Sequence, residues 1–127
     1  MADIETDEDI KKLVDAFYVQ VREDDLLNPI FADVAKVDWV QHLPKMYAFW
    51  NGMILGKPGY TGRPFPVHAV LPVGLEHFER WLAFFKLMVD ANFAGGGADR
   101  AKNAAASIAH TFAMRMGLIN PVAGQML

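Results

Sequence analysis

The chain has 127 residues, of which 53% are hydrophobic and 21% charged, with a net charge of −3 and no cysteine. This length predicts a single domain, residues 1–127, and the lack of cysteine excludes disulfides, thiolate catalysis, zinc fingers and iron–sulfur clusters. The 12 Lys and Arg residues are scattered along the chain, which argues against nucleic acid or an anionic membrane as a partner.

The first residues, MADIETDEDI, are acidic and lack the basic and apolar regions of a secretion signal. No apolar run approaches the ~20 residues that a membrane-spanning helix needs. We therefore expect a cytoplasmic protein. Because the hydrophobic share exceeds that of an average soluble domain, either the core is large or something apolar lies inside it.

The N-terminal half predicts three helices. Thr6 and Asp9 have the spacing of a capping box before a helix over about residues 7 to 23. Pro29 suits the first turn of a short second helix, and Asp38 can cap a third. Because Pro44 interrupts the third helix, we expect an irregular first turn or a regular helix that begins nearer His42 than Asp38.

The C-terminal half begins with an ordered loop over 56–66 that leads to a brief turn over 67–71. Apolar residues then repeat with helical period from Leu75 to Phe93, and we expect the glycines at 95–97 to end this helix. Asp99 is expected to begin the last helix, which Gly117 ends before a loose tail over about 118–127. No segment alternates apolar and polar residues as a half-buried strand does, so the predicted fold class is all-helical.

Two of the four histidines occupy unusual positions. His77 and His110 lie beside the apolar faces of their helices, where we expect them to form hydrogen bonds or face solvent. His42 shares a face with tryptophan, methionine and phenylalanine, and His68 lies between prolines in an apolar segment. A buried imidazole is costly unless it has a partner, so this pair indicates a site between helices.

Several chemistries do not fit this site. The chain contains no HExxH or ExxH motif for a zinc or di-iron centre, no nucleophile elbow, and no phosphate-binding glycine loop. A large, flat, apolar cofactor with one axial imidazole remains, namely haem. The alternative is a cofactor-free helical interaction module in which the histidines are structural and the aromatic residues form the core.

Four segments together resemble the truncated haemoglobins of group III. They are AFYVQVREDDLLNPIF, WVQHLPKMYAFWNGMILG, YTGRPFPVHAVLP and HFERWLAFF, and the resemblance covers about residues 10 to 116. It implies a shortened globin fold, a two-over-two helical sandwich around haem b. The glycines at 95–97 and the residues after Gly117 have no place in this pattern.

The resemblance also implies roles for individual residues. The proximal iron ligand of the family falls on His68, and its distal positions fall on Tyr18, His42 and Trp81. Apolar residues of the neighbouring segments are expected to form the haem wall, and two residues of the loop before His68 to bind the haem propionates. The wall residues are Phe31, Met46, Phe49, Trp50 and Phe78, and the propionate residues are Tyr60 and Arg63.

The function implied is reversible binding of O2 and other diatomic ligands such as NO and CO. Conversion of NO to nitrate, or a peroxidase-type reaction, would need a separate reductase, because the chain has no flavin or nicotinamide motif. We expect a monomer or a weak oligomer. The sequence leaves open whether His42 donates to the ligand, gates its entry, or itself binds the iron.

Overall fold

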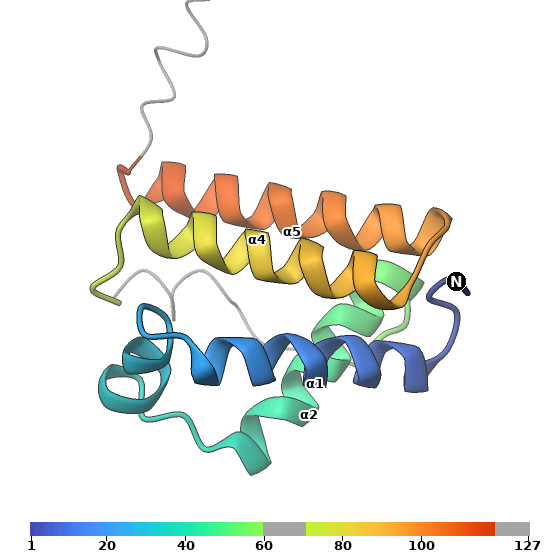
Figure 1. The fold of residues 1–127 in the computed structure, drawn as a ribbon, viewed down its shortest axis with the longest axis horizontal. Coiled ribbons are helices and arrows are strands. Elements are labelled where there is room, and N and C mark those ends of the chain that lie inside the picture. Colours follow the sequence, from blue (N-terminus) through green and yellow to red (C-terminus); the bar gives the residue numbers. More distant parts are fainter. Residues whose placement is uncertain (60–70, 119–127) are drawn as a thin grey trace, which may run out of the picture.

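Helices form most of residues 1–59 and 71–118, the part of the chain that this computed structural model describes (Figure 1). The segments in chain order are α1 (Asp7–Glu23), η1 (Ile30–Val34), α2 (Trp39–Trp50), η2 (Asn51–Leu55), α4 (Leu75–Asn92) and α5 (Gly96–Arg115). η1 and η2 are single π-helical turns. No strand occurs in the described ranges, so the all-helical prediction is confirmed.

The helices form two layers. α4 and α5 run antiparallel, side by side, above a layer in which α2 crosses beneath α1 (Figure 1). Alanines at 101, 105 and 109 are buried on α5. Phe17 of α1 and Phe85 of α4 are fully buried between the layers, with ring centroids 5.4 Å apart. This aromatic contact joins the two layers.

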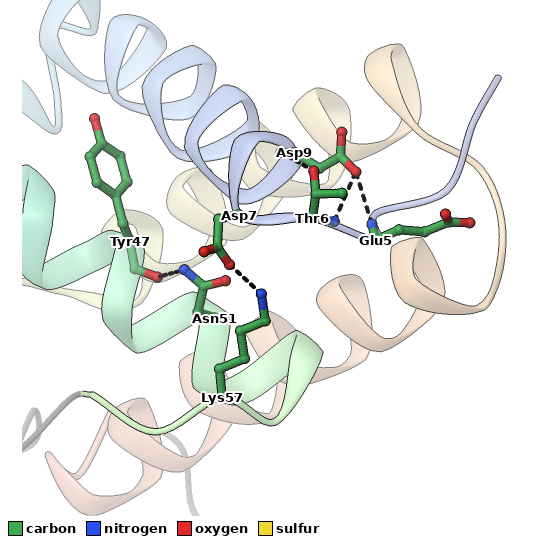
Figure 2. Close-up of polar contacts among 7 residues, drawn as sticks. All are labelled: Glu5, Thr6, Asp7, Asp9, Tyr47, Asn51 and Lys57. Atoms are coloured by element: carbon green, nitrogen blue, oxygen red, sulfur yellow. Dashed lines mark hydrogen bonds and ion pairs between the residues drawn. The ribbon is translucent and has the colours of Figure 1, made fainter.

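The start of α1 agrees with the sequence. The Thr6 hydroxyl accepts from the Asp9 backbone N–H at 3.2 Å, and the Asp9 carboxylate accepts from the Thr6 N–H at 3.1 Å (Figure 2). This is the reciprocal capping box. Nearby, Lys57 pairs with Asp7, which ties the segment after η2 to the first turn of α1.

The start of α2 differs from the expectation. Asp38 caps the helix as predicted, since its carboxylate accepts from the Val40 N–H at 3.1 Å. The helix is regular from Trp39 and runs through Pro44, so the expected irregular turn or later start is wrong. Pro44 deprives the Val40 carbonyl of its usual donor, but Val40 is 84% exposed and solvent can supply one.

The start of α5 also differs. α4 ends at Asn92 before the three glycines, and α5 begins at Gly96 rather than at Asp99. The cap comes from a distant residue: the Asp3 carboxylate accepts from the backbone N–H groups of Gly97 and Ala98, both at 2.8 Å. These N–H groups lack partners within the helix, so an acceptor here lets α5 begin three residues earlier.

The N-terminal segment packs so closely on α5 that one position requires glycine. A Cβ atom added at Gly97 would lie 2.6 Å from the Ile4 carbonyl oxygen, whereas one added at Gly96 would meet no atom closer than 3.6 Å. Ile4 is 1% exposed and belongs to the core. Residues 2–4 therefore cover the first turn of α5.

We expect Gly97→Ala to lower the free energy of unfolding by about 1–3 kcal/mol, because the added methyl group forces the backbone near Ile4 to move. Gly96→Ala is the matched control and should be neutral or stabilising, since it has room and restricts the unfolded chain. Urea denaturation measures both. Equal destabilisation by the two substitutions would contradict the close contact at Gly97.

We expect Asp3→Asn to destabilise the protein at neutral pH and to have a smaller effect in acid. Hydrogen bonds from Gly97 and Ala98 lower the pKa of Asp3 below its usual 3.8. A carboxylate whose pKa is lowered by folding stabilises the folded protein at pH values above its pKa in the unfolded chain. This stabilisation is lost as the pH falls through the pKa of the carboxylate in the folded protein. The melting temperatures of the two proteins should therefore differ at pH 7 and converge below pH 3. A constant difference would contradict the charged cap.

Candidate functional site

One cavity lies between the two helical layers. Its volume is about 130 Å³, and it opens to solvent. Helices α1, α2, α4 and α5 all contribute to its wall, together with η1 and the residues before α4. The wall is mostly aromatic and aliphatic.

All the site residues predicted from the sequence that fall in the described ranges line this one cavity. They are Tyr18, Phe31, His42, Met46, Phe49, Trp50, Phe78 and Trp81. The remaining three predicted residues, Tyr60, Arg63 and His68, lie outside the described residues, as does the brief turn expected over 67–71 apart from its last residue. The cavity therefore brings together side chains from segments that are far apart in the sequence.

Tyr18 is enclosed by aromatic rings. Its ring centroid lies 5.1 Å from Trp39, 5.6 Å from His42 and 5.9 Å from Phe31, each in an edge-on arrangement. Only 6% of Tyr18 is exposed. The hydroxyl sits in an apolar setting and forms no hydrogen bond with another described residue, so burial alone raises the pKa of Tyr18 well above its usual value. The phenol thus stays protonated and can donate.

Trp81 is held by stacking. Its ring is nearly parallel to Phe85, at 5.8 Å and 17°, and to Trp50, at 6.4 Å and 27°, and meets Phe17 edge-on at 5.6 Å. Three neighbours on two layers therefore fix the orientation of the indole. Trp81 and Tyr18 both line the cavity, which places two residues with hydrogen-bond donors around one space.

His42 joins the same wall from α2. Its ring lies 5.5 Å from Trp39, edge-on, and 6.5 Å from Phe31. The first turn of α2 positions it, because the His42 N–H donates to the Asp38 carbonyl at 2.8 Å. On the outer side, the Arg22 guanidinium covers the Trp39 ring at 4.9 Å. His42 and Tyr18 thus share one aromatic corner of the cavity.

The sequence interpretation missed His77 as a cavity residue. Its Nδ1 accepts from the Gly74 N–H at 2.9 Å, and its side chain is 15% exposed. The expected hydrogen bond is present, but the residue also lines the cavity. Its place three residues after Gly74, at the start of α4, is the signal that could have identified this contact. His110 is exposed, as expected.

The other missed lining residues are apolar, and nothing in their sequence pattern distinguishes them from ordinary core residues. They are Leu27, Ile30, Leu71, Val73, Ile108, Ala109 and Phe112. With the predicted residues they form an apolar enclosure that fits a flat, hydrophobic cofactor. The buried Tyr18 hydroxyl, which has no hydrogen-bond partner among the described residues, fits a polar ligand inside that enclosure.

The rest of the described chain offers fewer features. Within residues 1–59 and 71–118, no three His, Asp or Glu side chains come together as a metal-ion site would require. Over the same ranges, none of the helices combines the length and apolar character needed to cross a bilayer.

Comparisons with known proteins identify the family. The family model described as bacterial-like globin matches residues 2–117. The group 3 truncated haemoglobin ctb of Campylobacter jejuni is 41% identical over 83 residues, which are 62% of this chain and 65% of that protein, less than two thirds of its length. The crystal structure of a group III truncated haemoglobin from Campylobacter jejuni superposes with a TM-score of 0.83 and 32% identity, covering 94% of this chain and 97% of the other.

The fold, the family match and these relatives confirm the resemblance inferred from the four sequence segments. They also favour a globin over a cofactor-free interaction module, because globins are haem proteins. The chain therefore belongs to the bacterial-like globin family, as a truncated haemoglobin of group III, and this family implies a haem cofactor.

Proposed function

We propose that this protein binds O2 and other diatomic ligands, NO and CO among them, at a haem b in the cavity between the helical layers. The observation that carries the proposal is the phenol of buried Tyr18, a donor without a described partner, in a cavity that His42 and Trp81 also line. Haem supplies an iron that coordinates a diatomic ligand reversibly. The residues of the chain determine what is bound and how long it stays.

The cofactor is held by residues of two kinds. His68 would be the proximal ligand, and its second ring nitrogen would donate to a carbonyl or carboxylate that fixes the tautomer. Phe31, Met46, Phe49, Trp50 and Phe78 would provide the apolar wall, in keeping with their position around the cavity. We assign the propionates to Tyr60 and Arg63. An imidazole ligand gives less electron push toward O–O cleavage than a thiolate does.

Tyr18 and Trp81 are the donors on the opposite side. A diatomic ligand that carries partial negative charge accepts hydrogen bonds from the phenol and from the indole N–H. Both donors are preorganised: aromatic rings enclose Tyr18, and Phe85 and Trp50 stack on Trp81. In a cavity with few competing water molecules, such bonds are stronger than in solvent.

His42 has three possible roles, and its place beside Tyr18 and Trp39 is compatible with each. It can donate to the ligand, open a path by swinging outward, or bind the iron when no ligand is present. Conversion of NO to nitrate and a peroxidase-type reaction are redox extensions of the same site, and both need electrons from a separate reductase or reductant.

The haem assignment is tested by spectroscopy. We expect the purified protein to take up hemin and give a Soret band and a ferrous-CO spectrum typical of histidine ligation. His68→Ala should lose that spectrum, whereas His110→Ala, which changes an exposed residue, should keep it. A protein that takes up no hemin would contradict the proposal, and a normal spectrum in His68→Ala would contradict the ligand.

The distal assignment is tested by kinetics. Tyr18→Phe and Trp81→Phe should each accelerate O2 dissociation. A net hydrogen bond is worth about 1 kcal/mol, which corresponds to about fivefold in rate, and about 1.5–3 kcal/mol to a charged group, which corresponds to about tenfold or more. Stopped-flow displacement of O2 by CO measures the rate. Val19→Ala, an exposed neighbour of Tyr18 on α1, is the control. Unchanged O2 dissociation rates in both variants would contradict the assignment of Tyr18 and Trp81 as donors that stabilise bound O2.

A further inference from the structure

A second tyrosine lies on the outer side of the α1–α2 layer, away from the cavity wall. The Tyr47 hydroxyl donates to the carboxylate of Asp15 on α1. Asp15 also accepts from Lys11 at 3.2 Å, and the Lys11 ammonium lies 5.8 Å from the centre of the Tyr47 ring. The Asp15 side chain is 38% exposed, so this polar cluster is accessible from solvent.

Aromatic residues lead from the cavity toward Tyr47. Trp81 lines the cavity and stacks on Trp50, which is 2% exposed, at 6.4 Å. Phe85 lies against both indoles, at 5.8 Å from Trp81 and 4.5 Å from Trp50. Tyr47 precedes Trp50 by three residues on α2, a spacing at which two Cβ atoms of a helix lie about 5–6 Å apart. Tyr47 and Trp50 are thus neighbours on the helix, whereas Trp81 and Trp50 are in ring contact.

The two described tyrosines differ in how readily they can lose an electron. A phenol that loses one electron becomes a strong acid, so its oxidation is favoured where a base can take the proton. Tyr47 has such a base in hydrogen-bond contact, Asp15. Tyr18 has no acceptor among the described residues and sits in an apolar enclosure. The tyrosine nearer the cofactor site is therefore the harder one to oxidise.

The same contact keeps Tyr47 protonated in the resting protein. Burial and the hydrogen bond to Asp15 raise the pKa of Tyr47 to about 12. At neutral pH the phenol thus holds its proton until the ring is oxidised, and the proton then has a short path to the carboxylate.

We propose that Trp81, Trp50 and Tyr47 form a relay that carries oxidising equivalents from the cavity to a second reaction site at Tyr47, where phenol-type reductants too large for the cavity are oxidised. Hydrogen peroxide is the oxidant. The inference rests on the proposed haem function, because the cavity must hold the group that reacts with peroxide.

The steps balance as follows. One electron leaves the Tyr47 ring toward Trp50, and the phenolic proton passes to Asp15 and from there to solvent. The neutral Tyr47 phenoxyl then takes a hydrogen atom from the external phenol. Two such cycles deliver two electrons to the cavity, and peroxide takes two protons from solvent. The net reaction converts one peroxide and two phenols into two waters and two phenoxyl radicals.

The first test uses peroxide. Haem-loaded, full-length ferric protein is mixed with hydrogen peroxide, frozen and examined by electron paramagnetic resonance. We expect a tyrosyl signal that is lost in Tyr47→Phe and retained in Tyr18→Phe and Tyr60→Phe, which account for the other two tyrosines of the chain. Asp15→Asn, which keeps an acceptor but removes the base, should weaken the signal. Oxidation of a bulky phenol should fall in Tyr47→Phe and Asp15→Asn.

The second test does not need the cofactor. Azidyl radicals from pulse radiolysis oxidise tryptophan in the full-length protein, and the decay of the tryptophanyl absorbance into tyrosyl absorbance gives the transfer rate. We expect Tyr47→Phe and Trp50→Phe to abolish or slow the transfer, with Tyr18→Phe as the matched control. Circular dichroism establishes that each variant is folded, because the Tyr47–Asp15 bond also ties α1 to α2.

The outcomes separate this inference from the function on which it rests. A protein that binds hemin and CO but gives a tyrosyl signal unchanged by Tyr47→Phe overturns the relay alone. Loss of the signal in Tyr18→Phe or Tyr60→Phe instead of Tyr47→Phe also overturns it. If no hemin is taken up, the proposed function fails, and the pulse-radiolysis rates still decide whether electrons move from Trp50 to Tyr47.

Discussion

The structure depends on keeping a space open between helices that would otherwise pack together. Protein interiors are normally filled to the density of organic crystals, and an unfilled apolar cavity costs stability. Here a cavity of about 130 Å³ lies between the layers, while Phe17 and Phe85 are fully buried. The edge-on contact of these two rings joins the layers, and Ala109, one of the buried alanines of α5, lines the cavity. A cofactor that occupies the space would complete the core.

The sequence predicted those features that depend on local spacing. Thr6 with Asp9, Asp38 before α2, and the apolar faces of the long helices all depend on residues a few positions apart. The cavity residues followed from the same faces and from the family resemblance. The start of α5 could not be predicted in this way, because its cap, Asp3, lies 94 residues from Gly97 in the chain. The role of His77 in the cavity wall likewise depends on tertiary packing, since a residue beside an apolar face can turn toward either side.

The contrast between Tyr18 and Tyr47 shows that the surroundings decide what a side chain can do. Both are phenols that stay protonated at neutral pH, and burial is the first cause in each case. Only Tyr47 has a carboxylate to receive its proton. In the proposed functions, Tyr18 keeps its proton and donates to a ligand, while Tyr47 gives its proton away. A carboxylate that can accept the phenolic proton is thus the feature that distinguishes a redox-active tyrosine from one that only donates a hydrogen bond.

The contact between the first residues and α5 has a consequence for the order of folding. Asp3 precedes α1, α2 and α4 in the chain, and Gly97 and Ala98 follow them. The cap on α5 can therefore form only after these three helices have been synthesised, and it closes a long loop whose entropy the rest of the fold must offset. Since Ile108, Ala109 and Phe112 of α5 line the cavity, this side of the cavity wall should become ordered later than the side that α1 and α2 supply.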